Sequence, residues 1–232
     1  FGTHLPFNPS TLDLVDLEFE EKALREVLKR RQPTKWFWCD QTDMFLAQYP
    51  DEWIDRCFTV MEDTPRHTHQ VLTKRADRMQ RYCARRYRQG VPSNIWCGVS
   101  CGNIKDGLPR LDALRRVDAA VRFVSAEPLL EDLGAVDLSG LHWLILGGES
   151  RQRKVVRPCD LIWLRSFVRQ GREQGVAVFV KQLGSRAELN GAPFRTKSRK
   201  GSKPEEWPDD LRVREMPEIP LRDRKGCAML AP

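Results

Sequence analysis

The sequence has no long apolar run, no recognisable export signal and few histidines. No stretch of about 18 consecutive apolar residues occurs, so we expect no membrane-spanning helix and no membrane partner. No leader pattern stands at the beginning of the chain, and we expect a cytoplasmic protein. The histidines lie before or at the starts of predicted strands, the end of an α/β barrel opposite to the usual active site. A Ser–His–Asp or histidine–metal mechanism is therefore not expected; the histidines are His4, His67, His69 and His142.

The cysteines do not form a metal-binding or disulfide pattern. Seven are present, an odd number at irregular spacing, and no Cys-x-x-Cys occurs. A chain of this size needs no disulfide framework, so we expect reduced thiols. Cys97 and Cys101 lie four residues apart, but Ile104, at the third ligand position of a cluster motif, cannot bind a metal. The residues present therefore predict no zinc site, no iron–sulfur site and no metal ligands.

Standard nucleotide-binding motifs are also missing, although the charge favours an anionic partner. No G-x-G-x-x-G follows a predicted strand, and no P-loop sequence occurs. The net charge is +7, and basic residues cluster at 81–88, 151–157 and 197–203. Such clusters attract phosphates, while a solvated helix face or a loose tail explains any one of them equally well. The three together favour nucleic acid or another anionic ligand.

Apolar runs and helical patterns alternate along the chain and predict an α/β barrel. With 232 residues, 41% of them hydrophobic, the chain suits one large α/β domain. Predicted strands cover residues 14–19, 35–39, 69–73, 95–100, 121–125, 142–146 and 176–180, and predicted helices cover 20–31, 51–61, 76–88, 108–116 and 160–174. Seven βα units in sequence predict a parallel (β/α) TIM-type barrel. Because a closed barrel has eight strands, we expect the first unit to lie upstream of Phe1.

The predicted barrel spans residues 1–185. Glycine, proline, lysine and arginine then become frequent, so residues 186–232 are expected to form a basic loop and an irregular C-terminal tail that packs on the barrel.

Polar residues follow the predicted strands, at the end where α/β barrels bind their ligands. Each one alone has a structural explanation, such as a helix cap or a tight turn. Together they mix acids with bases and suit a zwitterionic or phosphate-bearing ligand. We predict catalytic roles for Asp43, Glu127 and Glu149, and ligand-binding or cofactor-binding roles for Lys74, Arg75, Gly147, Gly148, Ser150 and Lys181.

A set of short motifs connects the chain with a known family. The motifs QVLTKR (70–75), WCGVS (96–100), EPLL (127–130), GGES (147–150) and KQ (181–182) stand in one order. With them, the chain resembles a family of phage and bacterial proteins of unknown function from about Leu14 to Pro217. Fuller members are similar to radical S-adenosylmethionine proteins, with a three-cysteine motif after a first strand. That similarity implies S-adenosylmethionine and a [4Fe–4S] cluster for the full-length family.

The three-cysteine segment is absent from this sequence and is expected before Phe1. The leading hypothesis is therefore a radical S-adenosylmethionine-like enzyme that acts on a nucleic acid or nucleotide-like substrate and is inactive as this fragment. By the resemblance, Glu149 and Lys181 contact the amino and carboxylate groups of the cofactor. One alternative is a barrel hydrolase or lyase that uses Glu127 and Glu149 as acid and base. Another is a non-catalytic phage protein that binds nucleic acid.

Overall fold

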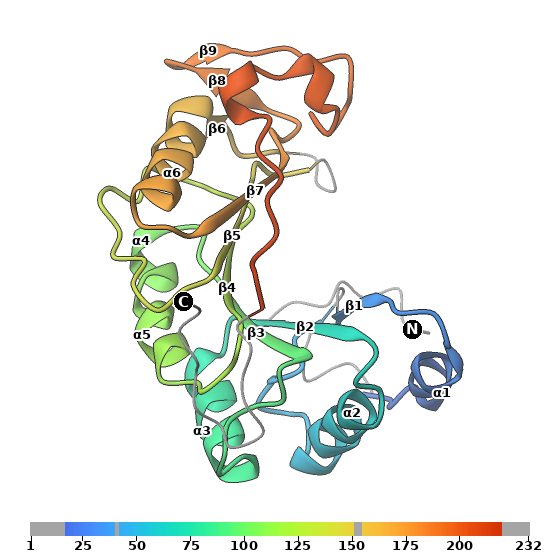
Figure 1. The fold of residues 1–232 in the computed structure, drawn as a ribbon. Coiled ribbons are helices and arrows are strands. Elements are labelled where there is room, and N and C mark those ends of the chain that lie inside the picture. The colour runs from blue at the N-terminus through green and yellow to red at the C-terminus, as the bar shows by residue number, and fades with distance from the viewer. Residues whose placement is uncertain (1–16, 40–41, 151–154, 220–232) are drawn as a thin grey trace.

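The computed structural model describes residues 17–39, 42–150 and 155–219, and it shows a mixed α/β fold. Six parallel strands form one sheet in the order β1-β2-β3-β4-β5-β7. Each strand lies beside the next long strand in the sequence, and the sheet curls into a half-barrel (Figure 1). All the carboxyl ends of these strands therefore point to the same rim.

The strands of this sheet are β1 (Lys35–Trp38), β2 (Thr68–Thr73), β3 (Ile95–Ser100), β4 (Arg122–Ala126), β5 (Trp143–Gly147) and β7 (Ala177–Gln182). The helices are α1 (Glu21–Lys29), α2 (Asp51–Asp63), α3 (Ala76–Arg86), α4 (Ile104–Gly107), α5 (Pro109–Arg115) and α6 (Leu161–Glu173). Helices α3, α4, α5 and α6 lie along the outer face of the curled sheet (Figure 1).

Most predicted elements are present, with two differences. The strand predicted over 14–19 is not found: residues 17–19 belong to no strand, and 14–16 lie outside the described residues. The helix predicted over 108–116 begins earlier and is divided into α4 and α5, because Asn103 caps the first segment and Pro109 begins the second. The sheet within the described residues thus has six parallel strands where seven βα units were expected, and a closed barrel stays a prediction.

Apolar side chains pack on both faces of the sheet. The larger core lies between the strands and the helices. On the opposite face, Trp143 has ring-centroid distances of 5.8 Å to Trp96, 5.9 Å to Phe123 and 6.0 Å to Phe179. Gly98 makes room for this layer, since a Cβ there would lie 2.4 Å from the Phe123 ring. These side chains form a second packed core on the inner face of the half-barrel. Burial of one such ring stabilises the fold by about 1.5–3 kcal/mol.

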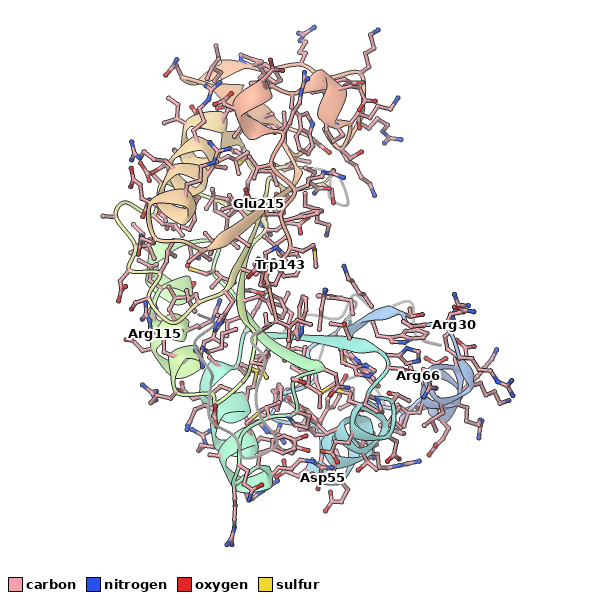
Figure 2. All side chains as sticks on the ribbon, viewed as in Figure 1. Arg30, Asp55, Arg66, Arg115, Trp143 and Glu215 are labelled. Atoms are coloured by element: carbon pink, nitrogen blue, oxygen red, sulfur yellow. The ribbon has the colours of Figure 1, made fainter. Side chains whose placement is uncertain are left out.

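The C-terminal part of the chain covers one edge of the sheet. A small second sheet combines β6 (Cys159–Asp160), β8 (Ala187–Leu189) and β9 (Ala192–Pro193), and two short 3-10 helices follow at Pro204–Glu206 and Asp209–Leu211. The amide of Val180 on β7 donates to the Val213 carbonyl at 2.8 Å, and the Glu215 amide donates to the Val178 carbonyl at 2.8 Å. Trp143 Nε1 also donates to the Glu215 carbonyl at 3.0 Å, and the two residues lie together in Figure 2.

These short strands have too few residues to produce a periodic signal, and the sequence analysis did not predict them. The domain boundary expected between residues 185 and 186 stays a prediction.

Candidate functional site

The predicted site residues all lie at the carboxyl-end rim of the sheet, in two groups. Asp43, Lys74 and Arg75 gather beyond β2. The second group lies beyond β4, β5 and β7 and comprises Glu127, Gly147, Gly148, Glu149, Ser150 and Lys181. No hydrogen bond or ion pair within the described ranges joins the two groups. Convergence of all of them on a single ligand therefore stays a prediction.

The carboxylate of Asp43 is almost fully occupied by hydrogen bonds. Only 9% of the residue is exposed. It accepts from Thr73 Oγ1 at 2.6 Å, from the Lys74 amide at 2.9 Å and from the Phe45 amide at 3.0 Å. The Arg75 guanidinium completes the set at 2.8 Å. These bonds hold the loop before α2 against the turn between β2 and α3, so the geometry favours Asp43 as a residue that positions Arg75.

The described residues form a cavity of about 320 Å³ and a larger one of about 510 Å³ that many charged side chains line. The larger one adjoins the Asp43 group at the start of α3, and we call it the anion cleft. Five cationic side chains and two acidic ones line it: Lys74, Arg75, Arg78, Arg81 and Arg110, with Asp77 and Asp106. The surplus of positive charge beside a helix N-terminus favours an anionic ligand.

Three of these five cations are held in place and two are not. Arg75 is held by its ion pair with Asp43. Arg78 donates to the Tyr49 carbonyl at 2.7 Å and pairs with Asp51 at 2.7 Å. Arg110 donates to the Ser100 carbonyl at 2.7 Å. The side chains of Lys74 and Arg81, by contrast, have no hydrogen bond or ion pair within the described part of the chain. The cleft thus combines cations held by other side chains or carbonyl groups with two cations that have no such partner among the described residues.

At the second group, an ion pair crosses strand β5. Lys181 Nζ on β7 lies 2.9 Å from Glu127 Oε2, which follows β4. Gly147 on β5 lies between them, and a Cβ there would stand 3.4 Å from Glu127 Cγ and 3.0 Å from the Gln182 carbonyl. A side chain at Gly147 would therefore press on the Gln182 carbonyl beside this pair. The Lys181 side chain is 55% exposed, so a solvent-borne ligand can reach it.

The loop after β5 is packed tightly against the residues that follow β7. A Cβ at Gly148 would lie 2.2 Å from the Leu183 carbonyl oxygen, so only glycine fits there. Glu149 accepts two hydrogen bonds from the Arg157 guanidinium, at 2.7 and 3.1 Å, and one from the Arg157 amide at 2.8 Å. Hydrogen bonding to Glu149 raises the pKa of Arg157. Ser150 is half-buried at the end of this loop, and the basic residues 151–154 lie outside the described residues.

The cysteines of the described residues do not fit an iron–sulfur cluster. Burial raises the pKa of Cys57 and of Cys159 to about 12 and that of Cys101 to about 11, which keeps these thiols neutral. No group of three or more cysteine, histidine or acidic side chains with metal-binding geometry occurs in residues 17–39, 42–150 and 155–219. The donor set that a [4Fe–4S] cluster needs is thus not provided by this part of the chain.

Three arginines of the anion cleft were missed in the sequence analysis as ligand-binding residues. Arg81 belongs to the basic run 81–88, but the run alone does not tell which side chains face a cavity. Arg78 and Arg110 lie on different helices, and only the packing of α3 beside α5 brings them to the same cleft. The available signal was the three-residue spacing of Arg78 and Arg81, which puts their side chains on one face of α3.

The chain matches a protein-family model over most of its length. A family model described as "Protein of unknown function (DUF5131)" matches residues 6–216. No curated protein and no solved structure matches the chain. None of the helices in the described residues is both long enough and apolar enough to cross a membrane.

Proposed function

Because the chain belongs to this family of proteins of unknown function, we propose from its site that it acts on a nucleic acid or nucleotide-like substrate and holds the substrate's phosphates in the anion cleft. One observation carries the proposal: five cationic side chains line a cavity at the carboxyl-end rim, where α/β barrels bind their ligands. The first amides of α3 add donors at the same place. A phosphate chain offers the several negative charges that such a cleft can neutralise.

The type of reaction is a separate proposal. The resemblance suggests radical S-adenosylmethionine chemistry, but the described cysteines do not fit the cluster, so we derive no step through it. A hydrolase or lyase that uses Glu127 and Glu149 is the rival. Each of these carboxylates is paired with a cation, Lys181 or Arg157, and this arrangement suits binding of charged groups better than proton transfer.

Binding of a labelled single-stranded oligonucleotide tests the phosphate site. We expect Lys74→Ala and Arg81→Ala each to weaken binding and to reduce the slope of log affinity against log salt by about 0.7. Both side chains lack partners among the described residues, so the variants should fold normally. Arg25→Ala is the matched control, because it removes one charge from the exposed face of α1.

The Arg25→Ala control distinguishes binding at the anion cleft from diffuse electrostatic attraction. If Arg25→Ala weakens binding as much as Arg81→Ala, the attraction is diffuse and the cleft is not a site. Competition with ATP then distinguishes the two forms of substrate, since a free nucleotide that displaces the oligonucleotide shares its site. A non-catalytic binding protein predicts that no substrate is converted in any variant, while oligonucleotide binding survives Glu127→Gln.

A further inference from the structure

The smaller cavity, of about 320 Å³, lies between α1, α2 and β1 and shares no lining residue with the anion cleft. We call it the aromatic cavity. Its size is at the lower end of the range of small-molecule sites, about 300–1,000 Å³. Six aromatic side chains line it: Phe19, Trp36, Phe37, Trp38, Tyr49 and Trp53. These six rings make the aromatic cavity a candidate ligand-binding site.

The charge of this lining is opposite to that of the whole protein. The chain has a net charge of +7, yet none of the described residues that line the aromatic cavity is a lysine, arginine or histidine. Three glutamates do, namely Glu18, Glu20 and Glu26, and all three are exposed. None of them makes an ion pair within the described residues. The lining therefore offers unneutralised negative charge at its edge and apolar surface inside.

Two pairs of these rings are tilted against each other. Phe19 and Trp53 have centroids 5.5 Å apart at an interplanar angle of 46°, and Tyr49 and Trp53 are 5.8 Å apart at 47°. Tilted rings of this kind form a corner instead of a stack. The Arg56 guanidinium already lies 4.5 Å from the Phe19 ring centroid, so a cation can contact this ring set. The face of an aromatic ring attracts cations through its quadrupole.

From these observations we propose that the aromatic cavity binds an organic cation that carries its charge on an alkylated ammonium group. The apolar wall accepts the alkyl groups, the ring faces attract the charge, and the three glutamates complement it from the edge. A metal ion would lack the closely spaced oxygen ligands that it needs there. A free primary ammonium is more strongly hydrated and would lose more of its water shell on entry.

Choline and its neutral isostere 3,3-dimethylbutan-1-ol are the probes that test this proposal. The full chain is titrated with each, and tryptophan fluorescence is followed, because Trp36, Trp38 and Trp53 line the cavity. We expect choline to bind and the isostere to bind at least tenfold more weakly. Glu20→Gln and Glu26→Gln should each reduce choline affinity several-fold, and Trp53→Ala by about twofold to thirtyfold.

The matched control is Glu52→Gln, which removes one negative charge from an exposed position of α2 outside the lining. It should leave choline affinity unchanged. The glutamate variants lie on the surface and keep the test valid even if Trp53→Ala unfolds, which circular dichroism would reveal. Equal affinity for choline and its isostere, an equal loss in Glu52→Gln, or no binding of choline at millimolar concentration would each overturn the proposal.

Discussion

Lys181 and Glu127 form an ion pair at 2.9 Å, although strand β5 lies between the strands that carry them. The two residues are 54 positions apart in the sequence, and the parallel order of β4, β5 and β7 brings them together. Since the Lys181 side chain is 55% exposed, water screens the pair and little stability depends on it.

We therefore expect Glu127→Gln and Lys181→Ala each to cost at most about 1 kcal/mol, measured by thermal unfolding. A larger loss of stability would mean that the ion pair stabilises the fold and is not available to bind a ligand. The comparison matters because the same variants are the natural choices for activity assays, which require that the fold is unchanged.

Asp43→Asn should separate structural from electrostatic effects at the anion cleft. The substitution weakens the four hydrogen bonds to a buried carboxylate, and we expect a loss of about 2–4 kcal/mol in the free energy of unfolding. It also releases Arg75 from its ion pair. Oligonucleotide affinity of the folded variant should fall as a result, because Arg75 is no longer held at the cleft. A folded variant that binds the oligonucleotide more tightly would contradict the positioning role of Asp43.

Gly148→Ala and Gly147→Ala should differ in their cost. At Gly148 the added methyl group would meet the Leu183 carbonyl at 2.2 Å, a backbone atom that cannot move aside cheaply. At Gly147 the contacts are looser, at 3.0 and 3.4 Å. We expect a loss of about 1–3 kcal/mol for Gly148→Ala and a smaller one for Gly147→Ala, measured by chemical denaturation. Equal losses would show that the loop after β5 relaxes freely.

His69 should make stability depend on pH. Its Nδ1 accepts from Trp38 Nε1 at 3.0 Å, and its Nε2 lies 2.9 Å from Thr64 Oγ1. Among the described residues, the neighbouring ring with a titratable nitrogen is that of His67, whose centroid is 6.0 Å away. Burial lowers the pKa of His69 to about 4, from about 6.5 in an unfolded chain. Between these values the unfolded chain binds a proton that the folded one does not. Stability therefore falls as pH decreases from 6.5 toward 4, by about 3 kcal/mol over the window.

Thermal unfolding at pH 7 and at pH 5 measures this effect. His69→Gln provides the control, because glutamine can accept from Trp38 and donate to Thr64 without titrating. The variant should lose less stability on acidification than the parent. An identical pH dependence in both proteins would show that groups other than His69 cause the acid sensitivity between pH 7 and pH 5.

Hydrophobic periodicity was sufficient to predict the long strands of the sheet, but it did not predict the short strands. Strands such as β3 are continuous apolar runs between glycine and proline signals, so their positions follow from local sequence. The two-residue strand β6 pairs with β8 through contacts that no local pattern encodes. The apolar alternation of Leu14–Phe19 did predict a strand, but residues 17–19 pair with no neighbour, which shows that alternation alone does not create a partner.

The candidate site divides in the same way. Residues that directly follow a strand, such as Lys74 and Glu127, could be placed at the rim because parallel strands share a direction. Contacts such as Glu149 with Arg157 depend on how a loop folds back, and the rings of the aromatic cavity come from four separate segments. Those arrangements are decided by packing between distant parts of the chain, which single-sequence patterns do not record.

The segment around Arg214 limits the addition of further strands to the half-barrel at β7. It runs antiparallel to β7 and uses the amide of Val180 and the carbonyl of Val178 for its own hydrogen bonds. A further parallel strand could not pair with this edge of β7, because these backbone groups of β7 are already hydrogen-bonded. To close the six strands into a barrel at β7, this segment would first have to detach. At the other edge of the sheet, residues 213–215 do not occupy the backbone groups of β1.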